Sequence, residues 1–387
     1  MTSLVRSTLR WSLSAVVLSS LIGCRQAPPT AIEAPRPFVF RSLDLNQRRD
    51  DGSRDWDLQS PEARYELSSR TVRARRPSGV LYRNDKPAYR ISAELATVLN
   101  DGELVVLEGE VRLQQLNEGR LMIRGDRLVW TPARSLMVID QNPEALDRDS
   151  RLLVRHLTFH QDRETLDFLG PTQLQRWHQT RQAKKPPQTV VRTGDGSWNL
   201  QSGSLEAAGP VTAVQAEEGR TLKASRLIGN TDRKYIDLIA PVRLTLPAQE
   251  GVVKAGDTRW RYADQQFTSD VPFRASLKRG EATGLGFRVN QATSTVIVPS
   301  NCRLKQPGEQ LKARRCSWNW VDETIIADGN VELRRSELDQ VTKAERLEGR
   351  TGKNGGFQFG VPGERVTSTL RLGETTPAKR TNPPVSF

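Results

Sequence analysis

Few residues in this chain could carry out metal or redox chemistry, because its 387 residues include only three His and three Cys. His156 and His160 have the four-residue spacing of a metal pair on a helix. The segment Leu152–Phe159 has a strand pattern, however, and four residues along a strand separate two side chains by about 13 Å. That distance is too long for one ion, and His178 has no neighbour of ligand type. We therefore expect surface histidines, no metal site and no cofactor.

The sequence also lacks the common catalytic motifs. No Walker A loop, dinucleotide fingerprint or nucleophile elbow occurs where a strand would lead into a helix. Gly284-Leu285-Gly286 precedes a strand pattern and indicates a turn. The 45 acidic residues are scattered, so no pair stands out for glycoside hydrolysis. The sequence predicts a protein with no catalytic residues, which is not an enzyme.

Cys302 and Cys316 flank the turn Pro307-Gly308-Glu309 at equal distances in sequence from Glu309. A hairpin centred there would place the two side chains opposite each other on adjacent strands, where a disulfide can form. A register change of one residue would turn them to opposite faces. The alternative is two free buried thiols, because both positions are apolar in sister repeats.

The third cysteine, Cys24, closes an export signal. Arg6 and Arg10 precede a short apolar stretch, and Leu21-Ile22-Gly23-Cys24 then matches a bacterial lipobox. The apolar stretch is shorter than the ~20 residues that span a bilayer, which argues against an uncleaved anchor. We expect residues 1–23 to be a lipoprotein signal peptide, Cys24 to be the lipid anchor and residues 24–37 to be a flexible tether.

The rest of the chain has the pattern of repeated β-hairpins. In Leu311–Arg334, alternation after Gly329-Asn330 places Val331 and Leu333 on one strand face. A single hairpin is marginal in water, so repeated hairpins must stack. Outgoing strands carry a small residue two places after an apolar one, which predicts a bulge or corner. Each returning strand starts with a step of Gly, Pro or Asn, as at Gly329-Asn330. The apolar position that follows this step recurs about every 30 residues, at Val80, Val111, Val211, Val242, Phe273, Cys302 and Val331.

These patterns predict an all-β fold: an elongated antiparallel array built from stacked hairpin repeats of about 30 residues. Helical repeats of similar length need apolar faces at helical period, which this chain lacks. The basic, Pro-containing segment 176–188 is interpreted as a linker between halves 38–175 and 189–373, or as a long loop at one edge. Residues 374–387 are expected to form a disordered tail.

Two sets of residues resemble a known family. The segment Asp55–Tyr65 resembles the N-terminal signature of the LptC family of periplasmic lipopolysaccharide-export proteins. Gly329–Leu333 and Gly109–Leu113 resemble the OstA-type hairpin that LptC shares with LptA. The chain departs from that family in its predicted lipid anchor and in having about twice as many hairpins. The resemblance implies a β-jellyroll, or "β-taco": two antiparallel sheets folded to a V with an apolar interior.

The resemblance also implies a function. It predicts a membrane-anchored periplasmic protein that takes lipopolysaccharide or a related glycolipid from an inner-membrane ABC transporter. The protein would pass it to an LptA-like β-groove protein by pairing of strand edges. The anchor would lie on the periplasmic side, at the inner membrane in preference to the outer. Inward side chains would line the groove, unless they close a packed core. The candidates are Val105, Leu107, Val111, Leu113, Leu121, Ile123, Leu128, Trp130, Trp318, Trp320, Ile326, Val331 and Leu333.

The formal net charge of +13 supports two interpretations. Lys and Arg near the groove mouth would attract phosphates or acidic sugars, or they would simply keep a long surface soluble. A structural or polysaccharide-binding β-repeat lipoprotein is the alternative function. A glycan-modifying enzyme is a third, and it would need a carboxylate cluster on one repeat. Export argues against nucleic acid as a partner.

Overall fold

The computed structural model describes most of the chain after residue 37: residues 38–116, 121–177, 180–181, 185–217, 219–350, 356–360 and 363–370. The description below concerns the unit Pro37–Phe387. The predicted signal peptide, Cys24, the tether and the C-terminal tail all lie outside the described residues.

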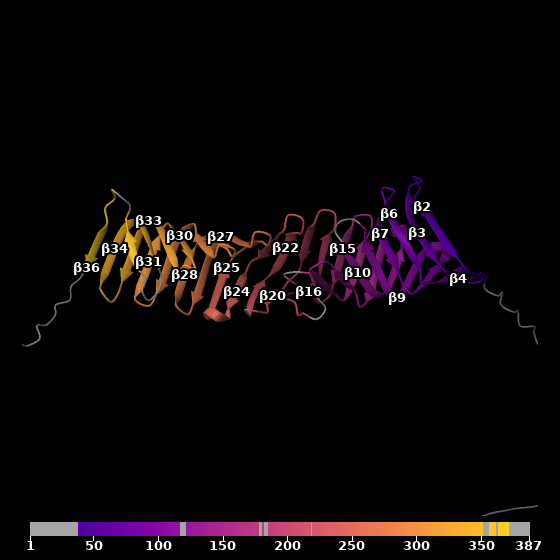
Figure 1. Cartoon of the computed structure of the whole chain (residues 1–387), viewed down its shortest axis with the longest axis horizontal. Coiled ribbons are helices and arrows are strands. Elements are labelled where there is room, and N and C mark those ends of the chain that lie inside the picture. Colours follow the sequence, from indigo (N-terminus) through magenta and orange to yellow (C-terminus); the bar gives the residue numbers. More distant parts are fainter. Residues whose placement is uncertain are drawn as a thin grey trace, which may run out of the picture. The chain divides into compact units, whose positions relative to one another are not determined.

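The described residues form antiparallel strands in two ladders, which we call the first wall and the second wall (Figure 1). The first wall contains β2 (Leu43–Arg48), β3 (Arg54–Ser60), β6 (Ser78–Arg83), β7 (Lys86–Ser92), β12 (Glu144–Leu146), β13 (Ser150–Leu153), β16 (Thr172–Arg176), β17 (Thr189–Thr193), β20 (Val211–Gln215), β21 (Arg220–Ala224), β24 (Val242–Leu246), β25 (Gly251–Ala255), β30 (Ser300–Gln306), β31 (Glu309–Ala313) and β36 (Thr367–Leu370).

The second wall is built in the same way. It contains β1 (Phe38–Phe40), β4 (Glu62–Glu66), β5 (Thr71–Arg75), β8 (Leu95–Leu99), β11 (Leu136–Gln141), β14 (His156–His160), β15 (Thr165–Leu169), β18 (Gly196–Asn199), β19 (Ser204–Ala207), β22 (Arg226–Asn230), β23 (Tyr235–Ile239), β26 (Thr258–Arg261), β29 (Thr295–Val298), β32 (Arg315–Asn319) and β35 (Phe357–Phe359).

Six longer strands bend and contribute one segment to each wall. They are β9 (Leu104–Gln115), β10 (Met122–Thr131), β27 (Gln266–Leu277), β28 (Gly280–Asn290), β33 (Thr324–Arg335) and β34 (Gln340–Arg350). The described part contains no α-helix, only the short 3-10 turns η1 (Asn100–Gly102), η2 (Pro132–Arg134) and η3 (Pro247–Gln249).

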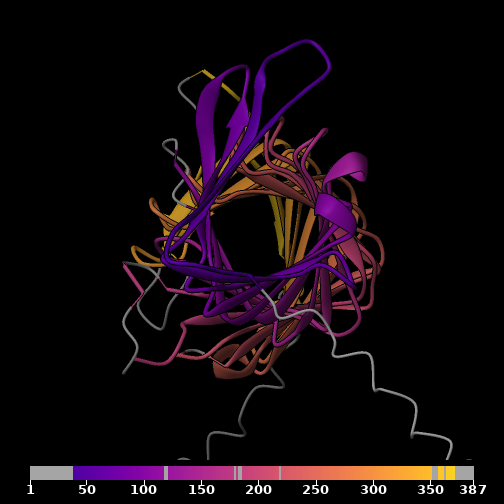
Figure 2. The same cartoon turned by 90° about the vertical axis from the view of Figure 1, so that its right-hand side faces the viewer.

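Each repeat passes once through both walls and forms one layer of the stack, which we call a rung. The chain runs along the first wall, turns a corner, runs along the second wall, and returns. Residues 86–115 of β7, β8 and β9 make such a rung, which confirms the repeat of about 30 residues. Figure 1 shows the rungs in sequence order from β2 to β36, and in the end-on view of Figure 2 they lie behind one another.

The corners explain why glycine recurs at the returning step. Gly329 and Asn330 in β33 have φ of +78° and +51°, and Gly109 and Glu110 in β9 have +75° and +44°. Glycine adopts this left-handed region without steric cost, so the strand can kink and continue in the other wall. The pairing of β33 with β34 shifts register between Asp328 and Val331. The bulge or corner predicted in the outgoing strands is seen in β10, whose pairing with β9 shifts register between Gly125 and Arg127.

The two walls face each other through apolar side chains. Trp56 of the first wall and Trp130 of the second have ring centroids 5.2 Å apart, as do Tyr89 and Phe159. These contacts identify the inner face of each wall, and the strand period of two then assigns every other residue to the same face. The predicted all-β, jellyroll-like fold of stacked hairpins is confirmed.

The basic segment 176–188 lies between paired strands. β16 pairs with β17 from Thr172↔Thr193 to Arg176↔Thr189, so the first-wall ladder is continuous across the segment. The buried Trp177 donates from Nε1 to the carbonyl oxygen of Lys185 at 2.9 Å. The strands on either side of the segment are therefore neighbours in one ladder.

Cys302 and Cys316 lie in different walls. Cys302 pairs with Ala313 across the β30–β31 hairpin, whose turn is Pro307-Gly308, so the expected cross-strand pairing of the two cysteines is wrong. The chain turns a corner at Arg314, and Cys316 begins the second-wall segment. Both side chains point inward there, and the structure joins them in a disulfide with a Cα–Cα distance of 5.9 Å. The bond ties the walls together close to a corner.

We expect loss of this disulfide to lower stability without opening the hairpin. The bond closes a loop with a sequence separation of 14, and a cross-link of that length stabilises by about 3 kcal/mol in the chain-entropy model. Cys302→Ala/Cys316→Ala should therefore lower the midpoint of urea unfolding measured without reductant. The control is wild-type protein with reductant, which should unfold at a similar midpoint. Two freely alkylated thiols in non-reducing mass spectrometry would contradict the assignment.

Candidate functional site

Two rows of inward side chains run through the whole ladder. The first inner row belongs to the first wall. Each of its members lies directly opposite the next one on the neighbouring strand, as Leu222 lies opposite Leu244 and Leu244 opposite Val253. Its members are Leu58, Gly79, Ile91, Leu113, Ile123, Ala145, Leu152, Leu174, Val191, Ala213, Leu222, Leu244, Val253, Ala275, Ala282, Leu304, Leu311, Leu333, Thr342 and Ser368.

The second inner row is the equivalent row of the second wall. It is richer in aromatic residues. Its members from the third strand of that wall onward are Val72, Val98, Val105, Trp130, Met137, Phe159, Leu166, Trp198, Leu205, Gly229, Ile236, Trp260, Phe267, Val289, Val296, Trp318, Ile325, Gly349 and Phe357.

The rows are buried along one stretch and partly exposed along another. From Leu58 to Ala145 in the first row and from Val98 to Leu166 in the second, every member is buried; Trp130 is 2% exposed and Phe159 is 0% exposed. We call this stretch the closed section. From Leu174 to Leu304 and from Trp198 to Trp318, most members are only partly buried. We call this stretch the open section.

Contacts between the walls seal the closed section. Besides the two aromatic pairs, Glu164 at the tip of the second wall forms an ion pair with Arg83 of the first. Tyr89 donates its hydroxyl to the Glu164 carboxylate at 3.5 Å. Burial, the larger cause, and the Glu164 charge raise the pKa of the Tyr89 phenol above its usual range. The neutral phenol is therefore the form that fits this position.

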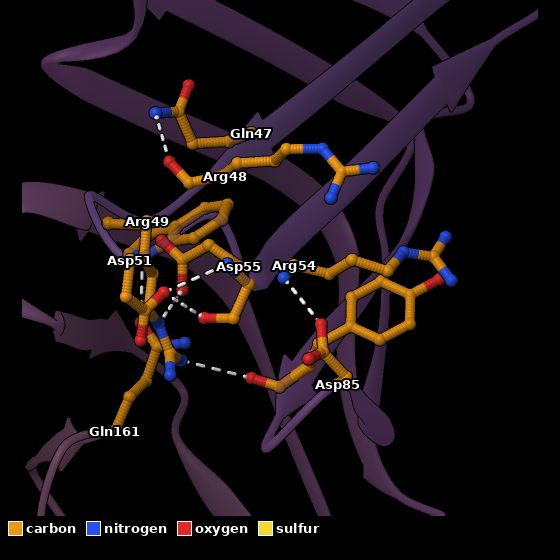
Figure 3. Close-up of polar contacts among 11 residues, drawn as sticks. Gln47, Arg48, Arg49, Asp51, Arg54, Asp55, Asp85 and Gln161 are labelled. Atoms are coloured by element: carbon orange, nitrogen blue, oxygen red, sulfur yellow. Dashed lines mark hydrogen bonds and ion pairs between the residues drawn. The ribbon is translucent and has the colours of Figure 1, made fainter.

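The first hairpin is fixed beside this seal (Figure 3). Arg49 donates to the Asp55 carboxylate at 3.1 Å and to the Tyr82 carbonyl oxygen at 3.2 Å. The backbone N–H of Arg54 donates to Asp85 at 2.8 Å. Figure 3 places Gln161, from the β14–β15 turn, near the same hairpin, and its side chain accepts a hydrogen bond from Trp130 Nε1 at 2.9 Å.

The open section offers apolar surface with few directional groups. Trp260 stacks on Phe267 with centroids 5.5 Å apart and planes 3° apart. The indole Nε1 atoms of Trp260 and Trp318 have no hydrogen-bond partner among the described residues. Such a surface can bind hydrocarbon, whose burial contributes about 0.8 kcal/mol per CH₂ group and needs no polar contacts.

A cation lies where the open section begins. The Arg176 guanidinium of the first wall lies 5.0 Å from the ring centroid of Tyr262, which follows β26 in the second wall. Arg176 Nη2 also lies 3.6 Å from Asp149. Burial raises the pKa of the Tyr262 phenol, whose hydroxyl donates to the Thr231 carbonyl oxygen at 3.1 Å. Arg176 and Tyr262 thus connect the walls at this point.

The groove candidates from the first half lie in the closed section. Val105, Leu107, Val111, Leu113, Leu121, Ile123, Leu128 and Trp130 are at most 5% exposed. Their strong alternation reflects a packed interior, which was the alternative interpretation of that set.

The second-half candidates are placed differently from one another. Trp318 lies partly buried in the open section, whereas Val331 and Leu333 are buried near the end of the stack. Trp320 is 37% exposed in the turn after β32. Ile326 pairs with Ser317 on the outer face, because Ile325 and Ala327 occupy the inward positions of β33.

Apart from Trp318, sequence reasoning missed the aromatic residues of the open section. Trp198 and Trp260 each lie in a short strand of otherwise polar composition, and Phe267 lies between Gln266 and Thr268 at the start of the longer strand β27. A tryptophan between polar neighbours, as in Arg259-Trp260-Arg261, was the available signal. It indicates an inner face that is apolar although the strand as a whole is not.

His156 and His160, the two histidines that the structure describes, lie in β14. His160 Nε2 lies 2.9 Å from Asp167, and Ser197 donates to the other oxygen of that carboxylate at 2.7 Å. The hydroxyl contacts the carboxylate rather than the imidazole, so this arrangement does not activate a nucleophile. Within the described ranges, no group of three or more His, Cys, Asp or Glu side chains could hold a metal ion.

These features define an all-β array with two facing walls, an apolar interior and a partly exposed inner surface. Residues 12–130 match the family model described as lipopolysaccharide-assembly, LptC-related, which confirms the predicted resemblance. The match covers less than a third of the chain and ends in β10, inside the closed section. No curated protein matches the chain.

The LptC-related family is a transport and binding family, not an enzyme family. Among the residues that the structure describes, no helix has the length and apolar composition needed to cross a bilayer.

Truncating one aromatic residue in each section should separate their roles. Phe159→Ala should cost about 3–5 kcal/mol, because it leaves a cavity between packed walls. The control Phe267→Ala should cost less than about 2 kcal/mol, because its ring is partly exposed in the native state. Urea unfolding followed by fluorescence measures both. Equal losses would show that the open section is packed like the closed one.

Stability should fall at alkaline pH partly through Tyr89. Its pKa is raised in the folded state above its ordinary value of 10.0, so its contribution is present below that pH and is lost as pH rises. The melting temperature of Tyr89→Phe should therefore decline less steeply than that of wild type from about pH 9 to about pH 11, a range centred on that ordinary pKa. Tyr65→Phe, in the first rung, is the control. Parallel declines in wild type and Tyr89→Phe would exclude this role.

Proposed function

We propose that this protein carries the acyl chains of lipopolysaccharide or a related glycolipid along the open section. The observation that supports this most directly is the pair of inner rows, which remain apolar from Leu174 to Leu304 and from Trp198 to Trp318 although most members are partly exposed. Exposed apolar surface of this extent indicates an interaction site rather than a solvated face.

The way the chains would move follows from the absence of directional groups. Adjacent strands lie about 4.8 Å apart, and each presents a similar apolar side chain. A hydrocarbon chain can slide from one rung to the next, because every position offers a similar free energy. Sugars and phosphates would remain in water at the outer edges of the walls.

Strand edges provide the docking sites in this proposal. In the described part, β1 and β2 each pair on one side only, and so do β35 and β36. Phe38, Val39 and Phe40 of β1 are all exposed, as expected of an edge that accepts another strand. One end would meet inner-membrane ABC transporter subunits and the other an LptA-like β-groove protein.

The similarity of residues 12–130 to the LptC-related model supports this pathway. A lipid on Cys24 would hold the protein at the periplasmic side of the inner membrane, and the signal peptide of residues 1–23 would direct its export. A structural or polysaccharide-binding role of the array is the second candidate, and it is favoured by cations on the outer face of the first wall.

Photo-crosslinking in cells tests the carrier role. A photoreactive amino acid in place of Trp260 or Val253 should label glycolipid, because both side chains belong to the open inner rows. Arg259, the outward neighbour of Trp260, is the matched control and should not be labelled above background. Leu128, buried in the closed section, should also remain unlabelled.

Two results would contradict the proposal. The first is absence of glycolipid at all positions of the open section. The second is equal labelling at Trp260 and Arg259, which would indicate non-specific contact with membrane lipid.

A further inference from the structure

The outer face of the first wall carries a row of cations that the interior does not use. Lys223 pairs directly with Arg243, Arg243 with Lys254, and Lys254 with Arg274 across successive strands. The same row continues through Thr283 to Arg303 and Lys312. We call the six charged residues the cationic row: Lys223, Arg243, Lys254, Arg274, Arg303 and Lys312.

This arrangement is unfavourable for the sheet alone. Like charges directly opposite each other on neighbouring strands destabilise a sheet. Among the described residues, Lys223, Arg243 and Lys254 have no ion pair, and Arg274 has only a contact of 3.9 Å with Glu281. The charges of Lys223, Arg243 and Lys254 therefore repel one another without a paired acid to offset them.

The outer face of the second wall is different. There Arg259 pairs across strands with Asp237 and donates two hydrogen bonds of 2.7 Å to its carboxylate. In the first-wall row, an acid lies directly opposite a cation only at the end, where Glu332 pairs across strands with Lys312 and lies 3.8 Å from it. The centre of the first-wall row therefore lacks the directly paired acid that Arg259 has in the second wall.

The centre of the row forms a shallow hollow. A space of about 230 Å³ is lined by Arg243, Lys254 and Arg274 together with Ser276 and Val252. Three cations and a hydroxyl directed at one space suit an anionic group that also carries hydroxyls.

We propose that the cationic row binds an acidic polysaccharide. Successive strands lie about 4.8 Å apart and, except at Thr283, each presents a charge, which matches a chain with repeated acidic groups. Neighbouring strands rotate by about 20–25°, so a planar membrane could contact only a few rungs, whereas a flexible chain can follow the row. The row contains no aromatic residue on which the bases of a single-stranded nucleic acid could stack.

This site is separate from the proposed lipid path. Lys254 lies between Val253 of the first inner row and Ala255, and points to the opposite face from both. The row therefore runs along the outside of the wall, and not along the groove mouth where the sequence placed such cations. Loss of polysaccharide binding at the cationic row therefore need not affect glycolipid binding in the open section.

Binding of the full-length protein to fluorescent polygalacturonate tests the proposal. Wild type should bind it, more weakly as salt is raised, and should not bind neutral dextran. Arg243→Gln/Lys254→Gln/Arg274→Gln should weaken binding about tenfold or more, since each lost cation removes a contact. The matched control Arg226→Gln/Arg233→Gln/Arg279→Gln removes the same net charge from exposed positions off the row. It should weaken binding less than about threefold.

Several outcomes would overturn the proposal. One is an equal loss of affinity in both triple variants, which would show that only net charge matters. Another is that wild type binds vesicles containing phosphatidylglycerol, or an oligothymidine, more tightly than polygalacturonate, and that the row variant abolishes this binding. The melting temperature of the row variant should equal or exceed that of wild type, because repulsion is removed. A clearly lower value would mean that the cations serve the fold.

Discussion

The structure depends on the register between strands. Each inner row exists because every strand pairs with its neighbours at a position that keeps the same face inward over the whole described ladder. A slip of one residue at any pairing would turn the apolar set of that strand outward and its charged set inward. Corners with positive φ, such as Gly329-Asn330, prevent such a slip, because they fix where the strand leaves one wall and enters the other.

The two sections differ in some of the side chains that face the interior. In the closed section, large side chains meet from both walls, as Trp56 meets Trp130 and Tyr89 meets Phe159. In the open section, the first inner row contains Ala213, Ala275 and Ala282 opposite a second row that still has large aromatics.

The sequence predicts the fold better than the site. Hairpins, corners and the repeat near 30 residues follow from local patterns, because turn residues and alternation are local properties. Local pattern still failed at Val80, which points outward because Gly79 and Leu81 take the inward positions of β6. It also missed the geometry of Cys302 and Cys316, whose contact depends on the corner between them and not on the hairpin turn.

Whether an inward residue is buried depends on the opposite wall, which a sequence pattern does not describe. The best-patterned residues, such as Leu128 and Trp130, are the most deeply packed, and the partly exposed Trp260 lies between two arginines.

The match to the LptC-related model ends within the closed section, and the open section follows it in the chain. In a stack of repeats each rung gains most of its stability from its neighbours, so a well-packed block can support adjacent rungs that are packed less completely. The closed section provides such a block at one end. The Cys302–Cys316 bond, in the last strands of the open section, provides a second with the buried Leu311, Ile325 and Leu333. Most of the open section lies between these two blocks in sequence. Its apolar surface can remain accessible because rungs on both sides hold its strands in register, and that accessibility is what a carrier of acyl chains requires.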